Sequence, residues 1–243
     1  MKVGLFIPCY IDQFYPQVGI ATLELLEKLG CEVVFPTNQT CCGQPMANSG
    51  YESLGGGCDR NFARNFEGVD YIVGPTGSCV LHVKHHIHSG NKDTDQWIQG
   101  HIFELTEFLT DVLKVQSLPS RFPYRVGLHQ SCHGQRGLHL SQMSELVAAS
   151  FSKPLQLLNM VSGVEMMPLD RIDECCGFGG TFCVFEEAVS AKMGKDRVAD
   201  HQRNRVEVIT GTDVSCLMHM EGIIRRDKLP LKVMHIAEIL NSN

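Results

Sequence analysis

Short apolar runs alternate with stretches of helical spacing along this chain. The apolar runs predict strands at residues 3–8, 32–36 and 71–75 in the first half, and at 125–129, 164–168, 206–210 and 231–234 in the second. Helical spacing covers residues 20–29, 59–65, 102–112, 144–151, 185–202 and 236–240, and Gly30 is placed to end the first of these helices. Strands that alternate with helices form βαβ crossovers, so each half is expected to hold a mainly parallel sheet flanked by helices. The predicted fold class is α/β and Rossmann-like, in two tandem similar halves.

The two halves also repeat one ordered pattern of cysteines, which indicates an internal duplication. Residues 3–9 read VGLFIPC and residues 126–132 read VGLHQSC, and each half continues with Cys-Cys-Gly and then Cys-x-x-His. The repeated cysteines are Cys9, Cys41, Cys42 and Cys79 in the first half, and Cys132, Cys175, Cys176 and Cys216 in the second. Residues 101–105 echo residues 235–239 in the same way. We expect two units, residues 1–118 and 119–243, with a proline-containing linker at 116–123.

Composition places the chain among globular proteins with a full hydrophobic core. Hydrophobic residues make up 43% and charged residues 20% of the 243 positions, so the fold needs no disulfides. The apolar run before Cys9 is too short for a signal peptide, and no stretch is long enough to cross a bilayer. Eleven cysteines are then expected in a reducing cytoplasm, where they bind metal or do redox chemistry. A net charge of −6 without a basic stripe argues against nucleic acid and anionic membranes as partners.

The repeated cysteines occupy positions where open α/β sheets bind their ligands. Cys9, Cys79, Cys132 and Cys216 each follow the carboxyl end of a predicted strand. In the Cys-Cys-Gly turns, Gly43 and Gly177 permit a left-handed backbone whose N–H groups can donate to sulfur. Thiols that are distant in sequence are therefore expected to meet along one rim.

Soft thiolates in groups of four suit an iron–sulfur cluster or zinc. Adjacent cysteines favour the cluster, because zinc sites generally space their cysteines by two to four residues. Two alternatives remain: the cysteines are small buried hydrophobes, or they do redox chemistry without metal. Neither explains why all eight positions repeat. The three cysteines without a counterpart, Cys31, Cys58 and Cys183, are expected to be buried core residues.

The histidines are less informative. His82 and His219 lie three residues after a repeated cysteine, so they are candidates for a fifth ligand, for a hydrogen-bond donor to sulfur, or for solvent-exposed helix residues. His85, His86 and His88 are expected at a solvated helix end. His101 and His235 are expected to open helices. Neither glycine-rich stretch has a phosphate-binding order, and no Ser-His-Asp arrangement is present.

The chain resembles the cysteine-rich CCG-domain proteins, which include the cysteine-rich subunit of heterodisulfide reductase and the electron-transfer subunits of glycerol-3-phosphate and glycolate oxidases. Within that group it is most similar to the lactate-utilisation protein A family, over nearly all of its length. The matching stretches are residues 9–16, 30–33, 41–45 and 131–133. The motif of heterodisulfide reductase ends in Cys-x-x-Cys, whereas this chain has His82 and His219 there.

The resemblance implies an oxidoreductase subunit in a cytoplasmic iron–sulfur system for L-lactate oxidation. It implies a partner with ferredoxin-like clusters and a third protein of the same system. The two sets of four repeated cysteines would each hold a metal site, with iron–sulfur clusters of the 4Fe-4S type and zinc as an alternative in one half. It assigns no catalytic residue. The competing interpretation is a non-catalytic scaffold in which zinc organises an interface between partners.

Overall fold

Two four-stranded parallel sheets form the framework of the chain in a computed structural model that describes residues 1–243. The first sheet has the order β2-β1-β3-β4, from β1 (Lys2–Leu5), β2 (Glu32–Val34), β3 (Tyr71–Gly74) and β4 (Ile102–Glu104). The second has the order β6-β5-β7-β8, from β5 (Arg125–His129), β6 (Glu165–Met166), β7 (Val208–Gly211) and β8 (Lys232–Val233). Every pairing is parallel, and Gly4 of β1 opposes Ile72 just as Gly127 of β5 opposes Ile209. The predicted duplicated α/β fold is confirmed.

Helices connect the strands in both halves. The first half contains α1 (Cys9–Phe14), α2 (Pro16–Lys28), α3 (Gln44–Asn48), η1 (Glu52–Gly55), α4 (Gly56–Asn65), α5 (Gly77–His86), α6 (Lys92–His101), α7 (Leu105–Glu107) and the π-helical turn η2 (Phe108–Val112). The second half contains the π-helical turn η3 (His133–Gly137), α8 (Lys153–Leu158), α9 (Phe182–Phe185), α10 (Glu187–Arg203), α11 (Val214–Asp227) and α12 (Ile236–Leu240). Pro16 starts α2 at a position where its missing N–H costs nothing, and Gly30 follows the helix with φ of +85°.

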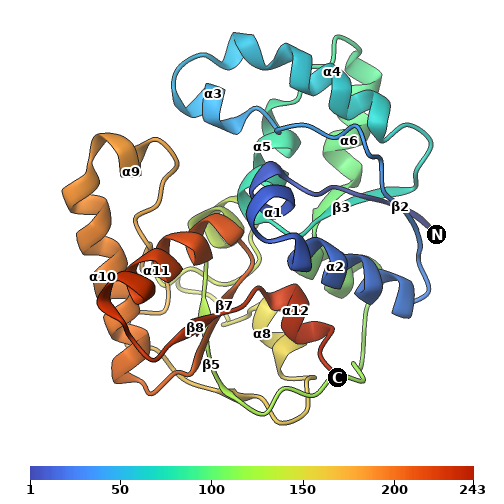
Figure 1. The fold of residues 1–243 in the computed structure, drawn as a ribbon. Helices are drawn as coiled ribbons and strands as arrows, with labels where there is room; N and C mark the ends of the chain where they lie inside the picture. Colours follow the sequence, from blue (N-terminus) through green and yellow to red (C-terminus); the bar gives the residue numbers. More distant parts are fainter.

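One hydrophobic cluster joins the two halves. Its 27 buried residues come from both sheets and from α2, α7, α8 and α12. Helix α2 of the first half packs on α12 of the second, near the chain's carboxyl end (Figure 1). The opposite face of each sheet has its own smaller cluster, under α4, α5 and α6 in the first half and under α10 and α11 in the second. The relative placement of the halves is thus held by apolar burial.

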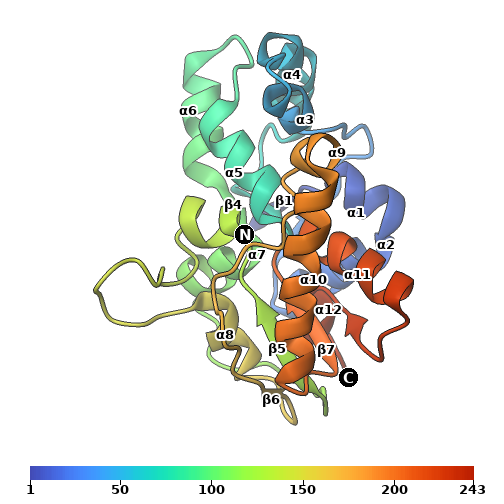
Figure 2. The same ribbon diagram turned by 90° about the vertical axis from the view of Figure 1, so that its left-hand side faces the viewer.

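Two predicted helices differ from the structure. Residues 102–104 form β4, which pairs with β3, and helical backbone starts only at Leu105. Residues 144–151 form turns and bends on a segment that extends away from the body (Figure 2). A short helix depends on burying one face, and here Leu146, Val147 and Phe151 are all exposed.

The sequence repeat predicted that His101 corresponds to His235, but the structure shifts this correspondence by three residues. Glu104 and His235 are the equivalent positions, because each is the N-cap of the helix that follows the last strand. His235 opens α12 as predicted, whereas His101 ends α6. The segment 116–123 is anchored, since its residues Leu118 and Phe122 are buried in the shared core. No helix is long and apolar enough to cross a membrane.

Candidate metal centres

The repeated cysteines lie at the switch points of the two sheets. In each half the chain leaves the inner strand for one neighbour and then crosses to the other side, so a crevice forms between β1 and β3, and between β5 and β7. Cys9 and Cys79 follow β1 and β3 in the first half. Cys132 and Cys216 follow β5 and β7 in the second. The Cys-Cys-Gly turns reach the same crevices from the crossover connections.

In the first half, four thiols form a continuous chain of contacts. The Cys41 thiol interacts with those of Cys42 and Cys9, and the Cys42 thiol also interacts with that of Cys79. The neighbouring thiols of Cys42 and Cys9 lower the pKa of Cys41, while the neighbouring Cys41 raises the pKa of Cys9 and Cys42. One thiolate is therefore stabilised among thiols that lose their protons when a cation enters. We call Cys9, Cys41, Cys42 and Cys79 the first quartet.

The second half repeats this arrangement in the same order. The Cys175 thiol interacts with those of Cys132 and Cys176, and the Cys176 thiol also interacts with that of Cys216. The neighbouring thiols of Cys132 and Cys176 lower the pKa of Cys175, and the neighbouring Cys175 raises the pKa of Cys132 and Cys176. These four residues are the second quartet.

The turn glycines have the predicted conformation and contacts. Gly43 has φ of +93° and Gly177 has φ of +86°. The N–H of Gly43 donates to Cys41 Sγ at 3.5 Å, and that of Gly177 donates to Cys175 Sγ at 3.3 Å. Positive φ strains any residue with a Cβ, so glycine keeps these donors aimed at sulfur.

The eight cysteines of the two quartets all line one cavity of about 370 Å³ between the two halves. Helices α5 and α11 begin at this cavity and carry Cys79 and Cys216 in their first turns. Backbone contacts hold the two helix starts together, because the N–H of Gly77 donates to the carbonyl of Thr212 at 3.1 Å. A Cβ at Gly77 would lie 3.1 Å from the backbone nitrogen of Gly134, so a larger residue would force the two segments a few tenths of an ångström apart. The quartets are thus neighbours across a tight junction.

The predicted accessory histidines take different positions. His82 is buried, faces the first Cys-Cys-Gly turn close to Gly43 and stacks on His86 at 5.1 Å. Burial lowers its pKa, and His86 lowers it further. His219 instead turns towards α10, with Nε2 3.3 Å from the carbonyl oxygen of Ser190. His85, His86 and His88 lie exposed around the end of α5, as predicted.

A histidine that the sequence analysis did not single out lies at the second quartet. His129 ends β5, is 1% exposed, and places a ring nitrogen within 4.8 Å of the sulfurs of Cys176 and Cys216. Neither of its ring nitrogens has a hydrogen-bond partner. Burial lowers its pKa to about 3, so the ring is neutral and able to bind a cation. The signal was present in the repeat, where His129 occupies the position of Phe6.

The cysteines without a counterpart stay outside both chains of thiol contacts. Cys31 is buried in the shared core, and the Cys183 thiol donates to the carbonyl of Gly180 at 3.0 Å. Cys58 lies beside Gly43, and burial raises its pKa. Cys31 is a core residue as predicted, whereas Cys58 and Cys183 are only partly buried.

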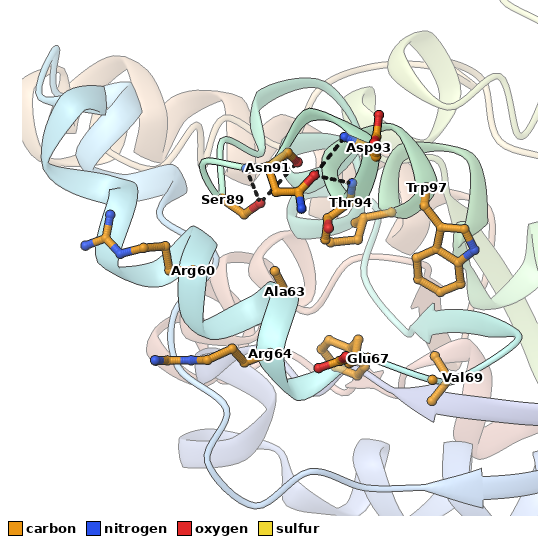
Figure 3. A pocket seen from close by; sticks show the side chains of 13 residues that line it. Arg60, Ala63, Arg64, Glu67, Val69, Ser89, Asn91, Asp93, Thr94 and Trp97 are labelled. Carbon is orange, nitrogen blue, oxygen red and sulfur yellow. Dashed lines mark hydrogen bonds between the residues drawn. The ribbon is translucent and has the colours of Figure 1, made fainter.

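A wider cavity of about 700 Å³ lies between α4 and α6, away from the quartets (Figure 3). Arg60 and Arg64 lie along one side and Trp97 on the other, while Asn91 bonds to the start of α6. No cysteine or histidine lines it. This cavity therefore lacks the thiol donors that the quartets present to theirs.

Comparison with known proteins agrees with this site. The sequence matches the family described as CCG, cysteine-rich domain, over residues 3–84 and 126–221, so fold and site define a protein with two cysteine-rich domains. Two curated relatives named Lactate utilization protein A, from Geobacillus sp. and Bacillus licheniformis, are 40% and 41% identical to this chain and are aligned over 100% of both partners. The chain belongs to the lactate utilization protein A family.

A solved structure shares the fold at low sequence identity. A hypothetical protein from Helicobacter pylori superimposes with a TM-score of 0.54 and 12% identity. The match covers 98% of this chain and 48% of the other, so this chain spans about half of that protein's length. The likeness concerns the fold alone.

Proposed function

We propose that this chain is an iron–sulfur oxidoreductase subunit that takes part in L-lactate oxidation and passes electrons through its Cys-Cys-Gly metal sites. The observation that carries the proposal is the convergence of two four-thiol quartets on one cavity. Four thiolates match the ligand set of an iron–sulfur cluster, and a cluster supplies one-electron transfer when bound. The lactate substrate comes from the name of the relatives, which share the full length of the chain.

The first quartet would hold one centre and the second quartet the other, with clusters of the 4Fe-4S type and zinc as an alternative in one of them. The residues present suit this role. Gly43 and Gly177 donate N–H groups to sulfur, which stabilises negative charge on a loaded centre. Tyr10 and Phe178, 6.2 Å apart between ring centres, line the cavity and add apolar surface beside the thiols.

Partners are part of the proposal. The sequence carries no flavin or nicotinamide fingerprint, so electrons must pass to another protein. We assign a ferredoxin-like iron–sulfur protein and a third subunit of the same system to this role, in the cytoplasm, where thiolate ligands stay reduced. Exposed apolar side chains beside the cavity offer a contact surface, above all Val184 and Phe185 of α9.

Iron and acid-labile sulfide analysis of protein purified without oxygen tests the proposal. We expect stoichiometric iron and sulfide with broad absorption near about 400 nm from thiolate-to-iron charge transfer. Colourless protein that holds only zinc, even after anaerobic reconstitution, would support a non-catalytic scaffold instead. The same preparation should not oxidise lactate rapidly with a soluble dye unless its partners are added.

A further inference from the structure

The side chains that pack against the two sheets, next to the quartets, differ between the halves. The first difference lies beside two equivalent glycines, Gly4 and Gly127. A Cβ at Gly4 would lie 2.6 Å from the ring of Phe66, and a Cβ at Gly127 would lie 2.4 Å from Nδ1 of His201. Since Gly4 and Gly127 have the same register in their sheets, Phe66 and His201 occupy the same place. An apolar ring in the first half is thus replaced by an imidazole in the second.

Two further positions show the same replacement. Phe6 and His129 follow the matching strand sequences, and Phe62 and Arg197 lie one helical turn before Phe66 and His201. In the first half the three phenylalanines pack together, with ring centres 5.0 Å apart for Phe6 and Phe62 and 4.6 Å for Phe62 and Phe66. In the second half, His129, Arg197 and His201 are at most 1% exposed. The first half therefore has an aromatic cluster at the place where the second half has a buried polar cluster.

A buried polar group without a hydrogen-bond partner is costly, because water has been removed and its hydrogen bonds are lost. Arg197 is anchored through Nη1, which donates to the carbonyl of Arg171 and to Asp200. His129 and His201 have no such partner at either ring nitrogen. His129 differs from His201 because one of its ring nitrogens lies in a group with the sulfurs of Cys176 and Cys216 in which all atoms are within 4.8 Å of one another. That geometry suits ligands of one ion.

We propose that His129 is a metal ligand, so that the second centre has mixed nitrogen and sulfur donors and takes a single divalent ion of the zinc class. His129, Cys176 and Cys216 supply three donors, and one of the two remaining thiols of the second quartet, Cys132 or Cys175, supplies the fourth. The first centre, with Phe6 at the equivalent position, keeps only thiolates and takes the cluster. The inference rests on the proposed function in one respect, namely that the quartets bind metal.

The surroundings fit this ligand set. Three thiolates and a neutral imidazole around a divalent ion carry a net charge of −1, and the cationic Arg197 lies behind them in the same buried cluster. The first half has no cation at the equivalent position, where Phe62 stands. Arg197 is already paired with the buried Asp200 at 3.1 Å, so the two halves differ here in polarity rather than in net charge.

The second centre can be studied alone in the Cys41→Ser/Cys42→Ser variant of the full chain, which lacks half of the first quartet. Protein freed of metal would be titrated with Zn²⁺ and with Co²⁺ as a spectroscopic probe. We expect one ion per chain, and X-ray absorption with both sulfur and imidazole scattering. Adding His129→Phe, the residue of the first half, should weaken Zn²⁺ binding at least about tenfold. His219→Phe is the matched control and should leave Zn²⁺ binding unchanged.

Sulfur-only scattering, or unchanged affinity in His129→Phe, would overturn the assignment of His129. So would iron and sulfide, in place of a single ion, in the isolated second centre. If His129→Phe fails to fold by circular dichroism, the scattering of the protein with His129 intact decides alone. Absence of iron and sulfide from the unmutated chain would contradict the proposed function. The imidazole scattering would still test, independently of that result, whether a histidine binds the metal.

Discussion

The carboxylate of Asp213, in the second half, accepts a hydrogen bond of 2.8 Å from the backbone N–H of Ser78, in the first half. Its other oxygen accepts from the backbone N–H of Ser215 at 3.2 Å and from the Ser215 hydroxyl at 2.7 Å. Asp213 therefore caps α11 and holds the start of α5 at the same time. Because Cys79 and Cys216 lie in the first turns of these helices, this buried side chain adds a polar link between the two quartets to the apolar core that the halves share.

Asp213→Ala should destabilise the metal-free protein by about 2–4 kcal/mol. A lost N-cap costs about 1 kcal/mol, and the buried N–H of Ser78 left without a partner costs about 1–3 kcal/mol. Urea unfolding under reducing conditions measures the change. Asn91→Ala is the control, because Asn91 caps only α6 on the surface and its loss should cost about 1 kcal/mol. Equal losses in the two variants would mean that Asp213 does not bridge the halves.

Each quartet should lose its metal separately. Cys41→Ser with Cys42→Ser should empty the first centre and spare the second, and Cys175→Ser with Cys176→Ser should do the reverse, because each thiol chain is confined to one half. Metal and sulfide analysis of anaerobic preparations gives the count. Loss of all metal in either variant would indicate a single shared centre. Cys31→Ala, which opens only a small gap in the core, should keep the full metal content.

His235 should make the fold acid-sensitive. Burial lowers the pKa of His235 to about 4 from about 6.5 in the unfolded chain, so the unfolded state binds the proton more readily. Its contribution is complete above pH 6.5 and is lost as the pH falls towards 4, by about 2 kcal/mol at pH 5. His235→Asn keeps an N-cap that does not titrate. The variant should therefore lose less stability than the parent between pH 7 and pH 5 in urea unfolding, and parallel losses would contradict the prediction.

Glu104 has the opposite dependence at the equivalent N-cap of the first half. Burial raises the pKa of Glu104 to about 8, although the backbone N–H of Thr106 donates to its carboxyl group at 2.7 Å. The stability that it contributes is complete below about pH 4.5, the pKa in the unfolded chain, and is lost as the pH rises through 8. Glu104→Gln should thus gain stability relative to the parent between pH 5 and pH 8. A constant difference across that range would show that Glu104 is ionised in the fold.

The exposed face of α9 should carry contact with the electron-transfer partner. Phe185 is 77% exposed, and its neighbour Val184 lines the cavity. Phe185→Asp should weaken association at least about tenfold without changing the metal content, because a charge is introduced into an apolar contact. Tyr124→Asp is the control, since the exposed Tyr124 precedes β5 at the amino end of the strands, whereas the cavity lies beyond their carboxyl ends. The affinity for the reconstituted partner would be measured by calorimetry. If Phe185→Asp weakens binding no more than Tyr124→Asp does, α9 lies outside the interface.

Much of the architecture follows from the sequence by itself. Alternation of apolar runs with helical spacing is a local property, and it located seven of the eight strands. The repeat of the cysteines predicted two equivalent halves, and Gly43 and Gly177 have the positive φ that their place beside the thiols requires. Each of these features depends on residues near one another in the chain.

Only the tertiary structure decided the rest, because it depends on which distant side chains meet. Residues 102–104 become a strand since β3 offers an open edge, and residues 144–151 are not helical since no surface receives their apolar side chains. The sequence alone does not distinguish His129 from other strand residues, and the role that we propose for it depends on two thiols from other segments that lie near a ring without a hydrogen-bond partner. Local spacing specifies the elements, whereas burial of a polar group beside remote sulfurs is a property of packing alone.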